Sequence, residues 1–202
     1  MDPVGLFALF PGWRIVAPAD AFDYIGLFNT AMRSLDPVVI LEHHSLYGRE
    51  FPVPKGILDY CVPFSRARVV SVGQDITVLT YSSMTGRLLN LRQRLQSGGV
   101  SVEIIDLRTV DLPGIDFETI GRSLKKTGTV AVVEEAAGAQ AIGDRIAAGI
   151  TVRFFDDLDA PAGFISSMNV PNSVSKVLEA EAMLQDEQIV EAITALAFRQ
   201  WR

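Results

Sequence analysis

Short β-branched runs alternate with amphipathic helical stretches along most of this chain, and this alternation restricts the fold more than any other feature of the sequence. In the central part, three apolar runs of strand type are separated by two stretches with apolar residues at helical spacing. The runs are 76–81, 102–107 and 129–133, and the helical stretches are 85–96 and 115–126. Strands joined by such helices require right-handed crossovers and a mostly parallel sheet that is covered on both faces. We therefore expect a three-layer α/β/α domain over about residues 66–202.

The pattern is less regular toward the C-terminus of this domain. A helix is expected over 140–148, and the Val-Arg-Phe-Phe sequence at 152–155 is of strand type, so it predicts a fourth strand. A long irregular stretch follows. Asp186 then stands where the N-cap of a final helix belongs, and this helix carries Ile189, Val190, Ile193 and Leu196.

The first part of the chain predicts a smaller β-α-β unit. Residues 14–17 form a short strand, Asp20 is placed to cap a helix, and the apolar run 38–41 is typical of a strand buried on both faces. One β-α-β unit is too small to stand alone, so we expect the chain to begin partway through a larger fold. Residues 48–66 are rich in Gly and Pro without a sustained period, which indicates a linker.

The composition argues against several classes of protein. The formal net charge is −6, and the 18 basic residues are scattered among 24 acidic ones, whereas binding to nucleic-acid phosphates needs clustered Lys and Arg. The only cysteine, Cys61, cannot form an internal disulfide, which favours a reducing compartment. No apolar run approaches the ~20 residues that span a bilayer. We expect neither a nucleic-acid partner nor a membrane partner.

Two pairs of adjacent residues are candidates for acid–base chemistry. His43 and His44 are expected to follow a strand and point to opposite sides, so they are poorly placed to share a metal ion. Either histidine has a catalytic or a structural role. Glu134 and Glu135 end a buried strand at its carboxyl edge, where ligands of open α/β sheets bind. One of them is a general acid or base, or else caps a helix or pairs across an interface.

Two further pairs carry weaker signals. Gly138 and Gly143 surround the start of a predicted helix, where they form either a phosphate cradle or a close helix-to-sheet contact. Ser82 and Ser83 follow the first strand of the larger domain, but no G-x-S-x-G elbow surrounds them. Taken alone, the residues describe a scaffold without a catalytic centre.

An ordered set of motifs resembles the beta subunit of thiamine-dependent 2-oxo-acid dehydrogenases, of the pyruvate or acetoin dehydrogenase type. The resemblance covers nearly the whole chain, and each motif alone is common. The motifs are Phe-Pro-Gly-Trp-Arg-Ile-Val-Ala-Pro at 10–18, Asp-Pro-Val-Val-Ile-Leu-Glu-His at 36–43, Leu-Tyr at 46–47, Glu-Ile-Ile-Asp-Leu-Arg-Thr at 103–109, Lys-Thr-Gly at 126–128, Val-Val-Glu-Glu-Ala at 132–136 and Leu-Asp-Ala-Pro at 158–161.

The resemblance implies how the chain is divided. Residues 1–60 would be the C-terminal remnant of a pyrimidine-binding α/β domain plus a linker, and residues 61–202 a transketolase C-terminal-like domain. In this family the alpha subunit holds the diphosphate of thiamine diphosphate and its magnesium ion. The glutamate that activates the aminopyrimidine, and a His-Ser-Gln motif, would lie upstream of this sequence. We therefore assign no catalytic and no cofactor-binding residue, and we expect this chain alone to be inactive.

The resemblance also implies two sites within the chain. Ala31 and Met32 would offer carbonyl oxygens to a structural potassium ion at a helix end, with Asp36 as a nearby ligand; an ordinary helix end is the alternative. Asp159 would contact a basic domain of the dihydrolipoamide acyltransferase core, or would only cap a local turn. After Pro161 the sequence departs from the family pattern.

These observations lead to three hypotheses. The first is the C-terminal portion of the beta subunit of the decarboxylating component of a 2-oxo-acid dehydrogenase, specifically a pyruvate dehydrogenase. This portion would contribute to assembly with an alpha subunit and a second beta subunit, and to docking on the core. The second is a non-catalytic assembly or binding module of the same fold. The third is a small-ligand domain that uses the sheet edge near Glu134. The expected compartment is the bacterial cytoplasm, or the mitochondrial matrix of a eukaryote.

Overall fold

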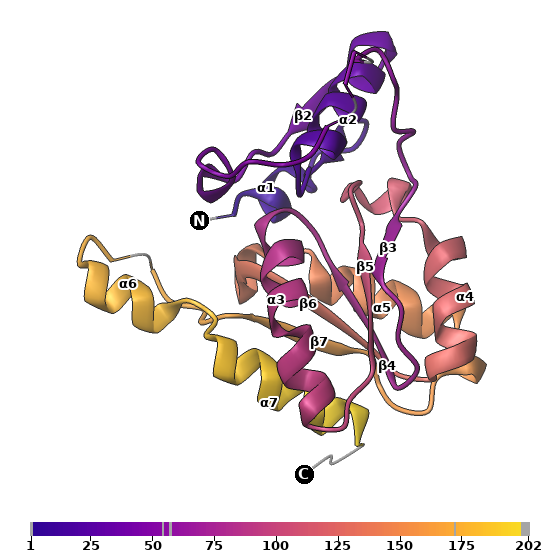
Figure 1. Cartoon of the computed structure of the whole chain (residues 1–202), viewed down its shortest axis with the longest axis vertical. Helices are drawn as coiled ribbons and strands as arrows, with labels where there is room; N and C mark the ends of the chain where they lie inside the picture. Colours follow the sequence, from indigo (N-terminus) through magenta and orange to yellow (C-terminus); the bar gives the residue numbers. More distant parts are fainter. Residues whose placement is uncertain (1, 54, 57, 172, 199–202) are drawn as a thin grey trace.

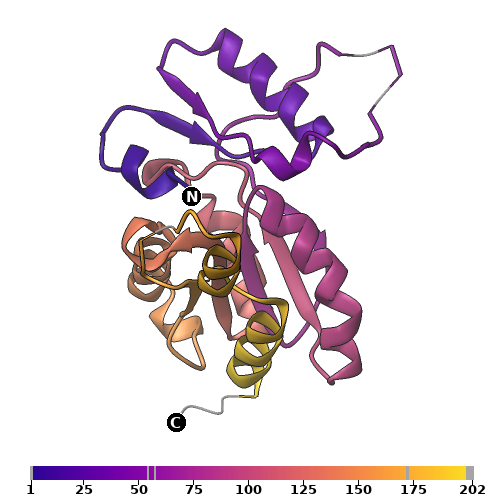
Figure 2. The ribbon, with the colours of Figure 1, turned by 90° about the vertical axis from the view of Figure 1, so that its left-hand side faces the viewer.

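The computed structural model describes residues 2–53, 55–56, 58–171 and 173–198, which form two α/β units of unequal size (Figure 1). The larger unit contains a five-stranded sheet and the smaller one a two-stranded sheet. The smaller unit lies over one end of the larger one, as the rotated view shows (Figure 2). Residues 54 and 57 of the predicted linker lie outside the described part of the chain.

The larger sheet has the strand order β3-β5-β4-β6-β7. Its strands are β3 (Arg68–Ser71), β4 (Ile76–Thr80), β5 (Val102–Asp106), β6 (Val130–Ala137) and β7 (Gly163–Ser167). Strands β4, β5, β6 and β7 run parallel to one another, whereas β3 pairs with β5 in antiparallel fashion. The predicted α/β fold with a mostly parallel sheet is therefore confirmed, and β3 and β7 are strands that the sequence pattern did not predict.

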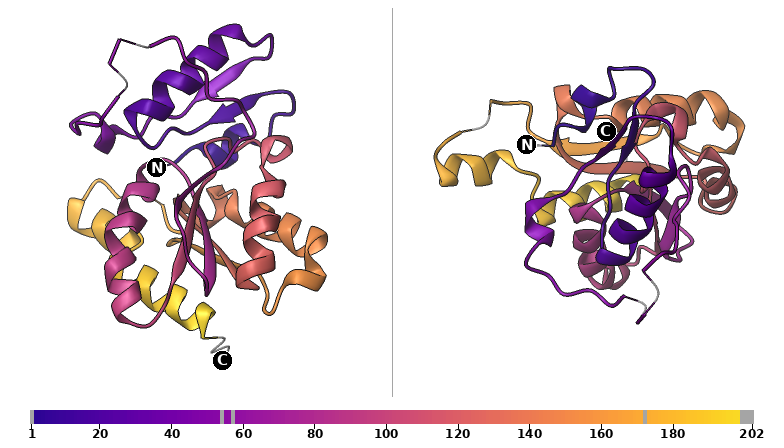
Figure 3. Two further views of the ribbon diagram at one scale, coloured as in Figure 1. Left: turned by 45° about the vertical axis from the view of Figure 1, so that its right-hand side comes forward. Right: turned by 90° about the horizontal axis from the view of Figure 1, so that it is seen from above.

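Helices cover both faces of this sheet (Figure 3). They are α3 (Ser83–Ser97), α4 (Phe117–Thr127), α5 (Gly143–Arg153) and α7 (Asp186–Ala197). Side chains alternate along each strand, so Leu79 of β4 packs with α4 and α5 on one face and Val78 packs with α3 and α7 on the other. All residues of β4 and β5 are buried, and three of the five residues in each strand are apolar, as is typical of strands covered on both faces.

The prediction of a fourth strand over 152–155 is wrong. Val152 lies in the last turn of α5, and Phe155 begins a short 3-10 helix, η4 (Phe155–Asp157). Val152 is 82% exposed and Phe155 is 73% exposed, so neither adds to the core. Phe154 turns inward and contacts Phe117, with ring centroids 6.5 Å apart. The fourth parallel strand is β7, within the stretch that was expected to be irregular.

The end of the described chain contains one helix that the sequence pattern missed. α6 (Lys176–Ala182) has no buried residue and projects from the body of the larger unit (Figure 1). α7 follows, and its N-cap is Gln185 rather than the predicted Asp186. The side chain of Gln188 accepts a hydrogen bond from the backbone N–H of Gln185, which is one half of a capping box. Among the described residues, no helix has the length and apolarity that a membrane crossing requires.

The smaller unit has the predicted β-α-β order. After the short helix α1 (Val4–Phe7), β1 (Arg14–Val16) pairs in parallel with β2 (Val38–Ile40), and α2 (Ala21–Arg33) connects them. Asp20 caps α2 as predicted, since its Oδ1 accepts from the N–H of Asp23 at 2.8 Å. All three residues of β2 are only half-buried, so the expectation of a strand buried on both faces is wrong. A 3-10 helix, η1 (His44–Leu46), follows β2.

Candidate functional site

The carboxyl ends of β4 and β6 face the smaller unit, and polar side chains gather there. Tyr81 directly follows β4, while Glu134 and Glu135 lie in the second half of β6. Asp2 and His43 reach these residues from the smaller unit through hydrogen bonds. Parallel strands end at the same edge of a sheet, so residues distant in sequence meet at the junction of the two units.

Glu134 is almost completely buried at this edge, with 1% of its residue surface exposed. Its Oε1 accepts from the N–H of Gly143 at 2.6 Å, and its Oε2 accepts from Ile142 at 3.2 Å. It thus satisfies two amides at the start of α5, where the helix dipole favours a negative charge. Burial raises the pKa of Glu134 to about 7 despite these hydrogen bonds. Of the alternatives for the glutamate pair, helix capping is confirmed for Glu134.

Tyr81 connects Glu134 to Asp2. Its hydroxyl oxygen lies 2.7 Å from Oε2 of Glu134 and 2.7 Å from Oδ2 of Asp2. A phenol has one hydrogen and can donate to only one of these carboxyl groups, so the other must itself carry a proton to complete both hydrogen bonds. Burial raises the pKa of Asp2, and both burial and the charge of Glu134 raise the pKa of Tyr81 well above its usual value. Both hydrogen bonds of Tyr81 are therefore complete only while Asp2 or Glu134 is protonated.

Glu135 points toward the smaller unit and pairs with His43. The Nε2 of His43 lies 3.1 Å from Oε1 of Glu135, and its Nδ1 lies 2.7 Å from Oγ of Ser45. The backbone N–H of Ser45 also donates to Nδ1, so Nδ1 is an acceptor and Nε2 carries the ring hydrogen. The hydrogen bond from His43 lowers the pKa of Glu135. Pairing across an interface, the other alternative for the glutamate pair, is thus confirmed for Glu135.

The two histidines do not diverge as the sequence pattern predicted. β2 ends at Ile40, so His43 and His44 are not in a strand, and their ring centroids are 5.0 Å apart. The strand alternation that would separate them does not apply. No group of three metal-ligating side chains occurs in the described part of the chain.

Two cavities flank the His43–Glu135 pair. One of about 110 Å³ lies against Asp2, Tyr81 and Ser82, and a second of about 240 Å³ extends from Glu135 toward Met168 and Met183.

Ser82 has φ +53°, a left-handed backbone at a non-glycine residue immediately before α3. The edge can bind and exchange protons through its two linked carboxyl groups. Neither Ser82 nor Ser83 has a hydrogen bond to a histidine in the described structure.

The proposed phosphate cradle at Gly138 and Gly143 is wrong. The carboxylate of Glu134 already occupies the amides at the start of α5, which leaves no place there for an external anion. A Cβ at Gly143 would lie 2.7 Å from Cε2 of Phe164 in β7, so this glycine permits close helix-to-sheet packing. The packing alternative is therefore confirmed at this position.

The predicted potassium ligands lie at and beyond the end of α2. The Ala31 carbonyl accepts from the N–H of Ser34 at 3.1 Å, and Met32 is 71% exposed. The N–H of Asp36 donates to Oγ of Ser34, so these residues form a compact turn. The backbone carbonyls of Ala31 and Met32 and the carboxylate of Asp36 offer oxygen ligands, which suit a hard cation. The potassium site stays a prediction.

Asp159 lies in the turn before β7, beside the end of α4. Its N–H donates to the Gly128 carbonyl at 2.7 Å, and Gly128 has the left-handed backbone of a helix C-cap. A Cβ at Gly128 would lie 2.8 Å from Cγ of Asp159, so the aspartate side chain rests on this glycine. These contacts give Asp159 a local structural role, while core docking stays a prediction.

Sequence reasoning found Glu134, Glu135 and His43 but missed the residues that complete the site. Tyr81 could have been found by the signal that selected the glutamates, because it also directly follows a buried strand. Asp2 has no such signal, since its place at the edge depends on how α1 packs. Arg68 and Arg108, which pair with aspartates from both units, were not predicted either.

A comparison with protein-family models matches residues 65–189 to the family described as "Transketolase, C-terminal domain". Beta subunits of the pyruvate dehydrogenase E1 component are similar over nearly the whole chain. The mitochondrial subunit beta-1 of Arabidopsis thaliana is 36% identical over 96% of this chain and 53% of its own length. The beta subunit of Rickettsia bellii is 35% identical over 95% of this chain and 58% of its own length. The chain thus spans little more than half the length of these relatives.

A solved structure titled "Split gene transketolase, inactive beta4 tetramer" has a similar fold, with a TM-score of 0.76. It is 22% identical in sequence and covers 96% of this chain and 61% of its own. This likeness concerns the fold alone. Together with the sequence matches, it confirms the resemblance that the motifs indicated.

Proposed function

The chain belongs to the transketolase C-terminal domain family, and from this premise we propose that it is the C-terminal portion of the beta subunit of a pyruvate dehydrogenase decarboxylating component. In this role it would support subunit assembly and form a wall of the active site. The observation that carries the proposal is the 35–36% identity to such beta subunits, which extends over 95–96% of the chain. The similarity therefore includes the smaller unit as well as the matched domain.

The proposal assigns no decarboxylation chemistry to the residues of this chain. Thiamine diphosphate would supply the carbanion that attacks a 2-oxo acid, and its ring needs a carboxyl group to share a proton. Glu134 does not fit this task, because two amides and Tyr81 already surround its carboxyl group. Glu135 is paired with His43. The buried carboxyl groups of this edge instead organise the junction between the two units, and we derive no step through the cofactor.

The partners follow from the same proposal. They would be an alpha subunit, a second beta subunit and the dihydrolipoamide acyltransferase core, with Asp159 as a contact for the core. The compartment would be the bacterial cytoplasm or the mitochondrial matrix, since relatives include bacterial and mitochondrial proteins. Ala31, Met32 and Asp36 would hold potassium, and an anomalous signal from thallium(I) beside these residues in a crystal would test this.

A second candidate is a non-catalytic assembly module of the same fold. The projecting helix α6 suits an assembly role, because Val177 and Leu178 are 71% and 60% exposed on a helix without buried residues. Such apolar exposure is typical of a surface that contacts another chain. Both candidates predict association, and they differ in whether the associated assembly decarboxylates a 2-oxo acid.

Co-expression with the alpha subunit from the same genome tests the proposal. We expect the two chains to co-elute in size-exclusion chromatography. Titration calorimetry of this chain alone with thiamine diphosphate should show no micromolar binding. The proposal would be overturned if this chain associates with neither the alpha subunit nor a full-length beta subunit. Micromolar binding of the cofactor to this chain alone would contradict the absence of cofactor-binding residues. Pyruvate-dependent reduction of ferricyanide by the assembly would favour the first candidate over the second.

A further inference from the structure

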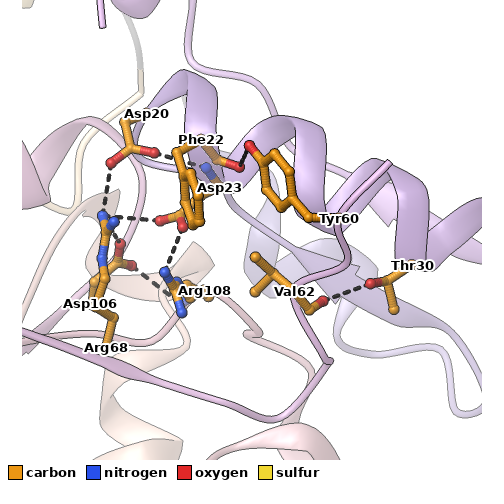
Figure 4. A network of polar contacts seen from close by, with 9 residues as sticks. All are labelled: Asp20, Phe22, Asp23, Thr30, Tyr60, Val62, Arg68, Asp106 and Arg108. Atoms are coloured by element: carbon orange, nitrogen blue, oxygen red, sulfur yellow. Dashed lines mark hydrogen bonds and ion pairs between the residues drawn. The ribbon is translucent and has the colours of Figure 1, made fainter. Parts of the chain in front are cut away.

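Three aspartates and two arginines form a cluster where the two units join (Figure 4). Asp20 and Asp23 come from the start of α2 in the smaller unit. Arg68 comes from β3, Asp106 ends β5, and Arg108 follows two residues later. The cluster therefore links the first turn of α2 to two strands of the larger sheet.

Arg68 is the centre of the cluster, and a single nitrogen makes its contacts. Its Nη2 lies 2.8 Å from Oδ2 of Asp20, 3.0 Å from Oδ2 of Asp23 and 3.5 Å from Oδ2 of Asp106. This nitrogen has two hydrogens, so it cannot donate one to each of three carboxyl oxygens. Arg108 donates two further hydrogen bonds. Its Nη2 donates to Oδ1 of Asp23 at 2.6 Å, and its backbone N–H donates to Oδ1 of Asp106 at 3.2 Å.

The cluster is short of positive charge, although the Nε atoms of Arg68 and Arg108 are buried without a hydrogen-bond partner among the described residues. With all groups ionised, three carboxylates face two guanidinium groups, and Asp23 and Asp106 are both 0% exposed. Oδ2 of Asp23 and Oδ2 of Asp106 are buried and have no hydrogen-bond partner of acceptable geometry among the described residues. Burying a net negative charge is costly. One proton on Asp106, whose Oδ2 makes the longest of the three contacts to Arg68, would neutralise the excess charge.

The groups around the cluster do not supply the missing positive charge. Tyr60, from the segment that follows β2, is the other titratable side chain that interacts with Asp20 and Asp23, and its own pKa is raised by burial and then by these aspartates. Thr80 of β4 pairs with Asp106 in register, and its Oγ1 has no partner in the described structure. Burial raises the pKa of Asp106 to about 8, with a further contribution from the charge of Asp23, while Arg68 and Arg108 oppose the shift.

The backbone beside the cluster holds the units together. The N–H of Ala17, after β1, donates to the Arg108 carbonyl at 2.8 Å, and Val16 forms an isolated bridge with Thr109. Arg108 has φ +58°, so the chain turns sharply at the point where it contacts the smaller unit. A change of charge at Asp106 therefore acts directly on the segment that joins the two sheets.

We propose that Asp106 keeps a proton at neutral pH and that its release at higher pH loosens the junction between the two units. While Asp106 is protonated, Arg68 and Arg108 balance the charges of Asp20 and Asp23 and bind α2 to the sheet. Loss of the proton adds a buried negative charge beside these aspartates, and the units separate more readily. The junction is thus a pH-sensitive latch, closed at neutral and acidic pH and weakened in alkali.

Hydrogen exchange of the complete chain between pH 6.5 and 9.5 tests the latch, after correction for the intrinsic exchange rate. We expect protection of the α2 amides to fall by up to tenfold per pH unit above the titration midpoint. Asp106→Asn, which keeps a hydrogen on this side chain, should remove this pH dependence. Asp116→Asn is the matched control, because Asp116 is also buried and caps α4, yet it contacts neither arginine.

Carbon-13 NMR of aspartate carboxyl groups gives a second measurement. The Asp106 signal is assigned by its absence from the spectrum of Asp106→Asn, which separates it from Asp2, whose pKa is also raised. An Asp106 midpoint above about pH 7 supports the proposal, and a midpoint below about pH 7 overturns it. It is also overturned if Asp106→Asn folds and keeps the wild-type pH dependence of α2 protection.

Discussion

Replacing Glu134 by Gln should change how the stability of this chain depends on pH. Glu134 is buried at the sheet edge, and burial raises its pKa to about 7 from an ordinary value of 4.5. The folded chain therefore binds a proton at this residue more tightly than the unfolded chain does. The stabilisation is fully present below the unfolded pKa and is lost as the pH rises through the folded pKa. A glutamine has a similar shape and does not titrate.

The size of the effect follows from these two pKa values. At pH 5 the proton on Glu134 contributes about 2.6 kcal/mol to the free energy of unfolding, and at pH 8 it contributes only about 0.1 kcal/mol. The wild-type chain should thus lose about 2.5 kcal/mol between pH 5 and pH 8 because of this residue. The Glu134→Gln variant should lack that part of the loss, whatever its absolute stability.

Urea unfolding followed by circular dichroism at pH 5, 6, 7 and 8 measures the difference between the two slopes. Glu103→Gln is the matched control, because Glu103 is also a buried glutamate, but hydrogen bonds from Lys126 and Ser123 outweigh its burial and lower its pKa. Glu103 stays charged from pH 5 to 8, so this variant should be less stable with an unchanged slope. The reasoning is refuted if Glu134→Gln and wild type lose stability in parallel over this range.

Three other substitutions test the packing around the site. Gly143→Ala should lower the free energy of unfolding by about 1–3 kcal/mol, because its methyl group would overlap the carboxyl group of Glu134, and urea unfolding would show this. Gly128→Ala should be destabilising by about 1 kcal/mol or more, since its φ is +64° and Asp159 fills the adjacent space; an unchanged melting temperature would contradict this. Thr77→Val should cost about 1–3 kcal/mol, because it removes a buried hydroxyl that bonds two other buried hydroxyls, whereas Thr77→Ser should restore most of the loss in thermal melts.

The sequence predicted the elements whose burial leaves a strong periodic signal. β4 and β5 were found because strands buried on both faces are rich in β-branched and other apolar residues. α3 was found because a helix buried on one face has leucines at helical spacing. The run 152–155 misled for the same reason: it is rich in Val and Phe, yet Val152 and Phe155 are exposed around a helix end. The edge strands β3 and β7 escaped prediction because they are only partly covered and so have mixed sequences.

The candidate site was predicted only in part. The position of Glu134 and Glu135 after a buried apolar run indicated the correct edge of the sheet, and capping and pairing were both foreseen as roles. The sequence could not assign one role to each residue, because that depends on which face of β6 each side chain occupies and on what lies there. Glu134 faces the start of α5, and Glu135 faces His43 in the smaller unit.

The sequence by itself determined the α/β class, the order of the main elements and the family, because local periodicity and ordered motifs survive along a single chain. Only the tertiary structure decided which carboxyl groups meet. The carboxyl groups of Asp2 and Glu134 meet at Tyr81, and those of Asp23 and Asp106 meet at Arg68, although each pair is far apart in sequence. The pKa of a buried acid depends on desolvation and on the charges within a few ångströms, and these arise only when the two units pack together.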